Sequence, residues 1–145
     1  MSIVIEHLNY VYMQGGPYET RALDDVSLTI HDGEFIGLIG HTGSGKSTLV
    51  QHLNGLILPT SGKITVDGMD LAEKGTDRRA IRRRVGLVFQ YPENQLFEET
   101  VAKDIAFGPK NLGLGEEEID RRVRTAMRRV ALDYDKLAQR SVFEL

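Results

Sequence analysis

The residues best suited to chemistry lie together in one glycine-rich segment. Its sequence, Gly40-His-Thr-Gly-Ser-Gly-Lys-Ser47, fits the pattern G-x-x-x-x-G-K-[ST] of a phosphate-binding loop, the Walker A motif. Glycines allow positive φ angles, so successive backbone N–H groups of such a loop can point at one phosphate group. We expect the Lys46 ammonium to reach the β and γ phosphates, and the Ser47 hydroxyl to bind the Mg²⁺ that bridges them.

The segments on either side of the loop would position it. The apolar run Phe35–Ile39 predicts a strand that is buried on both faces of a sheet and ends at Gly40. Residues 46–54 predict a helix that ends before Gly55. Its inner face would carry Leu49, Val50 and Leu53. The partial positive charge of the helix N-terminus would then lie at the phosphates.

Two other interpretations of the glycines are weaker. A purely structural turn does not call for a buried strand before it and an amphipathic helix after it. A dinucleotide-binding fold needs a third glycine, whereas Gly45 is followed by Lys46. Asp67 lies at a suitable distance for the ribose-binding acid of that fold, but Asp67-Gly68 is more simply a turn.

The rest of the sequence predicts an antiparallel start, a parallel core and a helical end. Alternating or apolar runs predict strands over residues 3–12, 26–30, 34–39, 63–66 and 85–89. The succession of strand, turn, helix and strand is typical of a parallel sheet. Helices are predicted over residues 100–107 and 116–132, separated by Gly108-Pro109 and by residues 113–115.

Composition excludes several classes of protein. The chain has 145 residues, with 18 Lys plus Arg against 21 Asp plus Glu, and a net charge of −3. Its 41% of hydrophobic residues is typical of a globular domain and excludes a disordered chain. The absence of Cys excludes a disulfide scaffold, and a cytosolic location is expected. No apolar run approaches the roughly 20 residues that cross a bilayer.

Arginines gather in two segments, residues 78–84 and 121–129. Nucleic-acid contact is one interpretation, but the acidic net charge argues against it. We interpret both groups as solvated helix faces, and we expect no nucleic-acid partner. The second group has acids at the i,i+4 spacing of ion pairs: Glu117 with Arg121, and Glu118 with Arg122.

Further segments carry a resemblance to a known family. They are residues 22–30 with Asp32-Gly-Glu34, residues 85–90, residues 89–97 (Phe-Gln-Tyr-Pro-Glu-Asn-Gln-Leu-Phe) and residues 99–108 (Glu-Thr-Val-Ala-Lys-Asp-Ile-Ala-Phe-Gly). Together with the loop, they resemble the nucleotide-binding subunits of ATP-binding cassette (ABC) transporters. The last two segments are similar to the energy-coupling factor (ECF) ATPases, which drive the uptake of vitamins and metal ions.

The resemblance implies an α/β fold, the P-loop NTPase fold of the ABC type. It comprises an antiparallel β-subdomain, a parallel core sheet and the start of a helical subdomain, with the C-terminal half absent. Residues 1–145 would form one partial nucleotide-binding domain. Residues 1–90 would hold the β-subdomain and the Walker A core through the Q-loop, and residues 91–145 the Q-loop and the first helices of the helical subdomain.

The resemblance also implies the site and its cofactors, ATP and Mg²⁺. The nucleotide would contact Gly40, His41, Thr42, Gly43, Ser44, Gly45, Lys46, Ser47 and Thr48. Tyr12 would stack on adenine, with Tyr10 and Tyr18 as alternatives. Gln90 would sense the γ phosphate and join Ser47 at Mg²⁺. We assign no acid–base role to any of these residues, His41 included.

Three kinds of partner follow from the resemblance: a second ATPase subunit, identical or different, a transmembrane coupling subunit, and a substrate-capture subunit. Residues 91–97 would receive a helix of the coupling subunit, and the protein would lie peripherally at the cytoplasmic face of the membrane. The resemblance implies that Leu145 is the first residue of the signature motif Leu-Ser-Gly-Gly-Gln, and that the catalytic carboxylates would follow it. We therefore expect this chain alone to bind ATP with little turnover, and to expose unpaired strand edges.

Two alternatives stay open at this stage. One is another phosphate-loop enzyme, such as a small-molecule kinase or a GTPase, although the Asn-Lys-x-Asp segment of a GTPase is absent. The other is an ABC ATPase that is not part of a transporter. A DNA-associated ABC protein would carry a long coiled coil after the Q-loop, and no heptad pattern is present.

Overall fold

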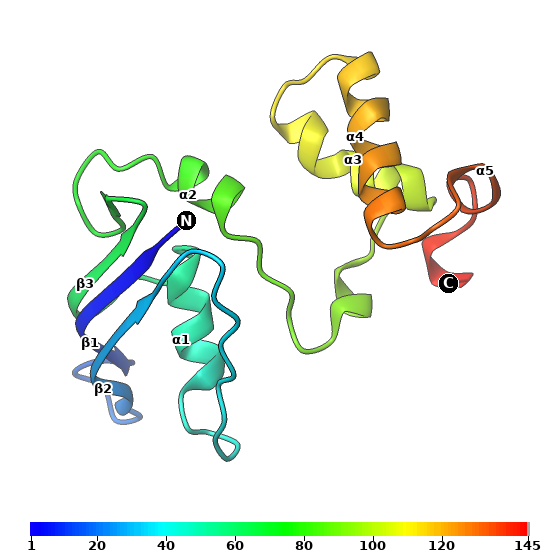
Figure 1. Ribbon diagram of the computed structural model, residues 1–145. Coiled ribbons are helices and arrows are strands. Elements are labelled where there is room, and N and C mark those ends of the chain that lie inside the picture. Colours follow the sequence, from blue (N-terminus) through cyan, green and yellow to red (C-terminus); the bar gives the residue numbers. More distant parts are fainter. Residues whose placement is uncertain (145) are drawn as a thin grey trace. The chain divides into compact units, whose positions relative to one another are not determined.

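The computed structural model describes residues 1–144, which divide into two compact units, Met1–Leu87 and the residues from Val88 onward (Figure 1). The first unit is built on a four-stranded sheet of order β2-β1-β3-β4, and every pair of neighbours is antiparallel. Its strands are β1 (Ile3–Tyr12), β2 (Thr20–Ile30), β3 (Ser61–Val66) and β4 (Met69–Asp70). The predicted antiparallel start of the chain is therefore confirmed.

One face of this sheet carries the core of the first unit. Because side chains alternate along a strand, Ile3 and Ile5 of β1 point to the same face, where they are buried with Ile64 of β3. Helix α1 (Lys46–Leu53) contributes Leu49 to this cluster. The packing fixes α1, and hence the loop that precedes it, against the sheet.

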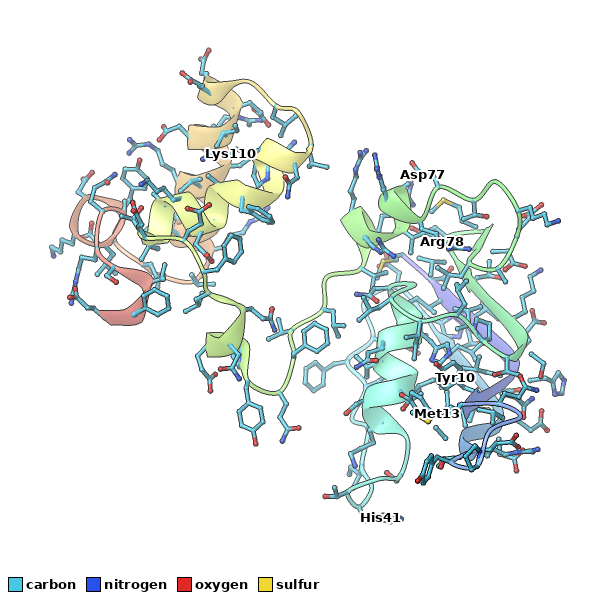
Figure 2. The ribbon with its side chains drawn as sticks, turned by 180° about the vertical axis from the view of Figure 1, so that it is seen from behind. Tyr10, Met13, His41, Asp77, Arg78 and Lys110 are labelled. Carbon is cyan, nitrogen blue, oxygen red and sulfur yellow. The ribbon has the colours of Figure 1, made fainter. Side chains whose placement is uncertain are left out.

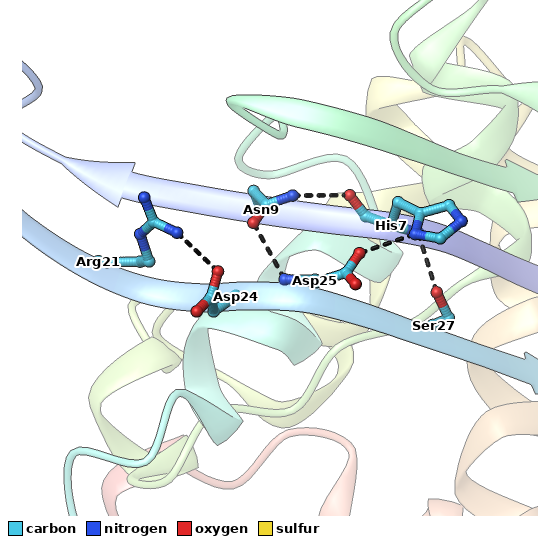
Figure 3. Close-up of polar contacts among 6 residues, drawn as sticks. All are labelled: His7, Asn9, Arg21, Asp24, Asp25 and Ser27. Carbon is cyan, nitrogen blue, oxygen red and sulfur yellow. Dashed lines mark hydrogen bonds and ion pairs between the residues drawn. The ribbon is translucent and has the colours of Figure 1, made fainter.

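The register of β1 against β2 shifts at three places between Ile5 and Val11, and side-chain contacts in this region are drawn in Figure 3. His7 and Asp25 both adopt φ 49, a left-handed conformation that is uncommon for residues other than glycine. Side chains replace the missing ladder bonds: the His7 ring lies 2.7 Å from the Asp25 carboxylate, and Ser27 Oγ accepts from the His7 N–H at 3.0 Å. Asn9 Oδ1 accepts from the Asp25 N–H at 3.0 Å. The two strands stay joined across the bulge.

Helix α2 (Arg78–Arg84) closes the first unit and carries the first arginine group. The Asp77 carboxylate caps it by accepting from the Arg79 N–H at 2.9 Å, and Ile81 is fully buried. Arg82 donates to the carbonyl oxygen of Gly55 at 3.1 Å, just beyond the end of α1.

Two predicted strands are absent from the described residues. Residues 34–39 and 85–89 have no strand partner within residues 1–144, and Phe35 is 100% and Ile39 96% exposed. An apolar run becomes a strand only when neighbours accept and donate its backbone hydrogen bonds, and neither segment has such a neighbour. The prediction of a parallel sheet from these two segments was therefore wrong for the described part of the chain.

The second unit is helical. It contains the 3₁₀ turn η1 (Pro92–Gln95), α3 (Val101–Asn111), α4 (Glu116–Arg129), α5 (Tyr134–Leu137) and the 3₁₀ turn η2 (Val142–Glu144). Val101, Ala106, Val123, Met127, Ala138 and Val142 form its buried core. Within residues 1–144, every helix falls short of the length and apolar character that crossing a membrane requires.

Both predicted helix ends in this unit were wrong by a few residues. α3 continues through Gly108 and Pro109 to Asn111 instead of ending at Phe107. Proline removes one N–H donor, but here the loss falls in the last turn, which the Leu112 N–H closes by donating to Gly108 O at 3.2 Å. α4 ends at Arg129 rather than Leu132, because Ala131 adopts φ 58 and turns the chain.

The acidic and basic residues of α4 pair almost as predicted. Glu118 accepts from both Arg121 and Arg122, at 2.6 and 2.7 Å. Arg121 therefore pairs three residues back with Glu118, and the predicted Glu117–Arg121 pair is not formed in the described structure. Arg124 pairs with Asp120 at 2.7 Å. These contacts agree with a solvated helix face.

Candidate functional site

The Lys46 side chain is hydrogen-bonded to the backbone of the glycine-rich loop to which it belongs. Lys46 Nζ donates to the carbonyl oxygens of Gly40 and His41, at 2.6 and 2.7 Å, and lies 3.3 Å from Ser44 Oγ. The ammonium group is therefore fixed inside the loop rather than extended into solvent. It can meet an anion that the loop amides bind.

Helix α1 presents backbone donors to the same place. The Leu49 N–H donates to Gly45 O at 2.8 Å, and the N–H groups that precede it in the helix have no acceptor one turn back. No side chain caps this end of α1, whose N-cap is Gly45. Uncapped donors and the helix dipole together are suited to bind a phosphate group.

Two glycines of the loop are required by close packing. Gly45 adopts φ 86, and a Cβ there would lie 2.5 Å from Ala22 O and 3.1 Å from Leu23 Cδ2. The loop thus rests on β2. A Cβ on Gly40 would lie 2.6 Å from Ser44 Oγ. A side chain at Gly45 would push the loop away from β2, because Ala22 O is a backbone atom, whereas a Cβ at Gly40 would require the Ser44 side chain to rotate.

The other loop residues are open to a ligand. His41, Thr42, Gly43 and Ser44 are exposed, and His41 lies at the turn that precedes α1 (Figure 2). The His41 ring donates from Nδ1 to Thr42 O at 2.8 Å, so its ring serves the loop backbone.

Ser47 fits the predicted role at Mg²⁺. It is exposed in the first turn of α1, directly after Lys46. Among the described residues, no three His, Asp or Glu side chains are grouped so that they could hold a metal ion. Mg²⁺ prefers oxygen ligands and keeps several waters, so one hydroxyl together with phosphate oxygens suits it here.

Of the three candidate tyrosines, Tyr12 lies beside the loop helix. Its hydroxyl is hydrogen-bonded to Thr48 Oγ1 at 3.1 Å, and the residue is 39% exposed. Tyr10 packs edge-on against Tyr12, with ring centroids 4.7 Å apart. Tyr10, which Figure 2 labels, is partly buried and packs against the core of the first unit. Tyr18 is 77% exposed. This geometry favours Tyr12 as the residue that stacks on a base.

Gln90 belongs to the second unit and is exposed, directly after the extended residues 85–89. The loop, Ser47 and Tyr12 all belong to the first unit. The structure thus brings together the phosphate loop and the predicted adenine-stacking residue, and the role of Gln90 stays a prediction.

Sequence analysis missed one buried polar residue next to the loop, His52. The predicted inner face of α1 was Leu49, Val50 and Leu53, whereas the buried residues are Thr48, Leu49 and His52. His52 Nδ1 donates to Thr48 O at 2.7 Å, and burial lowers the pKa of the ring. The available signal was its spacing: His52 lies one turn after Thr48 and three residues after Leu49.

The fold and this loop define a nucleotide-binding cassette, and comparison with known proteins identifies its family. The family model described as ABC transporter matches residues 23–145, so the chain belongs to the ABC transporter family. Membership favours the transporter interpretation over a kinase-like enzyme.

Curated relatives place it within that family. The chain is 62% identical over 145 residues to the energy-coupling factor transporter ATP-binding protein EcfA2 of Clostridium tetani, covering 100% of this chain and 50% of that protein. It is 50% identical over 147 residues to EcfA2 of Streptococcus pneumoniae, covering 100% of this chain and 52% of that protein. The chain thus spans about half the length of the curated relatives it matches. The expected resemblance to ECF ATPases is confirmed.

Solved structures agree with this assignment. CbiO1 of Clostridium perfringens, described as part of the ABC transporter complex cbiONQ, is 39% identical, with a TM-score of 0.75 over 93% of this chain and 52% of that one. A dimeric, post-hydrolysis state of the ATP-binding cassette MJ0796, bound to ADP and Pi, is 26% identical, with a TM-score of 0.81 over 99% of this chain and 62% of that one. The predicted fold class, that of the ABC ATPase cassettes, is confirmed, although its parallel core sheet is not formed within residues 1–144.

Proposed function

We propose that this chain is the nucleotide-binding part of an ECF transporter ATP-binding subunit. That subunit couples the binding and hydrolysis of ATP to the uptake of vitamins or metal ions. The observation that carries the proposal is the loop closed on Lys46, which places an ammonium group among uncapped amides at the N-terminus of α1. The relatives named EcfA2 support the transporter class.

Each part of the loop has a role toward MgATP. Lys46 and the loop amides bind the β and γ phosphates, Ser47 ligates Mg²⁺, and Tyr12 stacks on adenine. Bound Mg²⁺ neutralises charge that develops on the phosphates during transfer. As the resemblance implies, Gln90 would sense the γ phosphate and join Ser47 at Mg²⁺. Residues 1–90 serve as the β-subdomain and loop core, and residues 91–145 as the Q-loop and the first helices of the helical subdomain.

We propose the same partners that the resemblance implies: a second ATPase subunit, a transmembrane coupling subunit and a substrate-capture subunit. The related MJ0796 cassette is described as dimeric, and CbiO1 as part of a transporter complex, which supports an assembly of this kind. The subunit would then work at the cytoplasmic face of the membrane, held there by its partners. No nucleic acid is among them.

We also propose that the 145-residue chain hydrolyses ATP slowly when it is assayed alone. The loop residues 40–48 supply amides, hydroxyls, a lysine and one histidine that is engaged with Thr42. Phosphoryl transfer to water also needs a group that orients or activates the water, and none of these residues is placed to do so.

Binding of nucleotide by the chain tests the central proposal. The affinity for MgATP is measured by calorimetry for the wild-type chain and for Lys46→Ala, with Lys110→Ala as a control that removes an equal charge from α3. We expect Lys46→Ala to weaken binding at least tenfold and Lys110→Ala to leave it unchanged. Equal affinity of the wild-type chain and Lys46→Ala would exclude the phosphate site.

Turnover is measured on the same proteins by phosphate release. We expect the wild-type chain to hydrolyse ATP no faster than Lys46→Ala. Hydrolysis that depends strongly on Lys46 would contradict the proposal of a slow isolated chain while leaving the binding site intact.

A further inference from the structure

Tyr12 contacts Thr48 and Tyr10, and both of these residues also contact the buried residue His52. The Tyr12 hydroxyl is hydrogen-bonded to Thr48 Oγ1, and His52 Nδ1 donates to the carbonyl oxygen of the same Thr48 at 2.7 Å. The edge of the Tyr12 ring meets Tyr10, and Tyr10 in turn packs edge-on against the His52 ring, with centroids 4.8 Å apart. His52 therefore contacts both residues that touch Tyr12.

Burying the polar ring of His52 in the apolar core costs free energy. The residue is 0% exposed, and its Nε2 atom has no hydrogen-bond partner among the described residues. A leucine would fill the same core without leaving a buried polar atom unpaired. The hydrogen bond from Nδ1 to Thr48 O is what histidine provides here and leucine cannot.

The position of Tyr12 needs such support. It is the last residue of β1 and is 39% exposed, so packing alone covers only part of the residue. An aromatic side chain that is already held in the stacking orientation binds a base without losing rotamer freedom at that moment. The hydroxyl bond to Thr48 and the edge contact with Tyr10 provide this restraint.

We propose that His52 is a positioning residue for the nucleotide base. It holds Thr48 and Tyr10, and these two residues hold the Tyr12 ring in the orientation that stacks on the base. This inference rests on the proposed function, since it assumes that the loop binds a nucleotide and that Tyr12 stacks on its base. His52 itself touches neither the base nor the phosphates.

The test compares a ligand that has a base with one that lacks it. Affinities for MgATP and for Mg²⁺ with inorganic tripolyphosphate are measured by calorimetry on the 145-residue chain. The variants are His52→Leu, which removes the donor, His52→Asn, whose amide nitrogen can replace Nδ1 as donor to Thr48 O, and Tyr12→Phe, which removes only the hydroxyl. Thermal unfolding of each variant shows that the protein is folded at the assay temperature.

We expect His52→Leu and Tyr12→Phe each to weaken MgATP binding by about three- to tenfold, a range suited to the loss of preorganisation of one side chain. Tripolyphosphate binding should stay within twofold of wild type. His52→Asn should recover most of the lost ATP affinity. In the Tyr12→Phe background, His52→Leu should reduce the MgATP affinity by a smaller factor than it does in the wild type. The reason is that both changes disrupt the same set of contacts, which joins Tyr12, Thr48 and His52.

Three results would overturn the inference. They are unchanged ATP affinity in His52→Leu, equal losses for ATP and tripolyphosphate, and a full loss in His52→Asn. Each of these leaves the proposed function standing if Lys46→Ala still weakens the binding of both ligands at least tenfold. If Lys46→Ala has no effect on either ligand, the proposed function fails, independently of His52.

Discussion

Lys46 Nζ lies 2.6 Å from the carbonyl oxygen of Gly40, so the residue that opens the glycine-rich loop is joined to the residue that begins α1. This hydrogen bond connects the two ends of the loop, so that the loop surrounds the ammonium group. Lys46 thus shapes the loop, and in the proposed site it would also supply positive charge to a phosphate. Removing it should disorder the loop as well as weaken the electrostatic attraction.

The close packing of Gly45 against β2 leads to a prediction about stability. In Gly45→Ala, the new Cβ would meet Ala22 O at 2.5 Å and the residue would keep a positive φ. We expect the free energy of unfolding of the first unit to fall by about 2 kcal/mol or more. Gly43→Ala is the matched control, because Gly43 also has a positive φ, of 83°, but has open space around it. Urea unfolding measures both, and equal losses would show that the contact with Ala22 is unimportant.

The exposed Ser47 hydroxyl predicts a magnesium-dependent defect. Ser47→Ala should weaken ATP binding in the presence of Mg²⁺ and leave binding in EDTA nearly unchanged, because the hydroxyl acts through the metal ion. Thr42→Ala, which removes an exposed hydroxyl elsewhere in the loop, is the control. Calorimetric titrations with and without Mg²⁺ measure the effect, and a loss of the same size in EDTA would contradict a metal-ligand role.

Burial of His52 predicts that stability depends on pH. Because burial lowers the pKa of this ring below its ordinary value of 6.5, the unfolded chain binds a proton more readily than the folded one. The contribution of neutral His52 is therefore fully present above pH 6.5 and is lost as the pH falls from that value toward the lowered pKa.

Urea unfolding at pH 7.5 and at pH 5.5 measures this dependence. The wild-type chain should lose stability between the two, and His52→Leu should lose less. His31→Leu, which replaces an exposed histidine, should behave like the wild type. Identical losses in all three proteins would show that another group is responsible.

The N-terminus of α3 predicts a local effect in the second unit. Thr100 Oγ1 accepts from the Lys103 N–H at 3.4 Å, and the carbonyls of Arg140 and Ala138 accept from Val101 and Ala102. Thr100→Ala should reduce the protection of the first turn of α3 by about 0.5–2 kcal/mol in amide hydrogen exchange. Thr125→Ala removes a hydroxyl that bonds back to Arg121 O inside α4, and should cost less. A larger effect for Thr125→Ala would contradict the capping role.

Local features of this protein could be predicted from sequence, and features that depend on distant partners could not. The loop and the start of α1 are set by neighbouring residues, so the motif from Gly40 to Ser47 was sufficient. Residues 35–39 have the composition of a buried strand, but a strand also needs partners, and the sequence of the segment does not reveal whether they are present. His52 was missed because hydrophobic periodicity ignores a buried polar residue.

The exposed segment Phe35–Ile39 has a consequence for handling the chain in solution. Its aromatic and aliphatic side chains are exposed, and within residues 1–144 no neighbouring strand pairs with its backbone. A segment with these properties can pair with a strand of another molecule. Purified material should therefore cluster as its concentration rises, and light scattering should grow with it. Phe35→Lys should delay that clustering, because the charged side chain would oppose the association of two such segments.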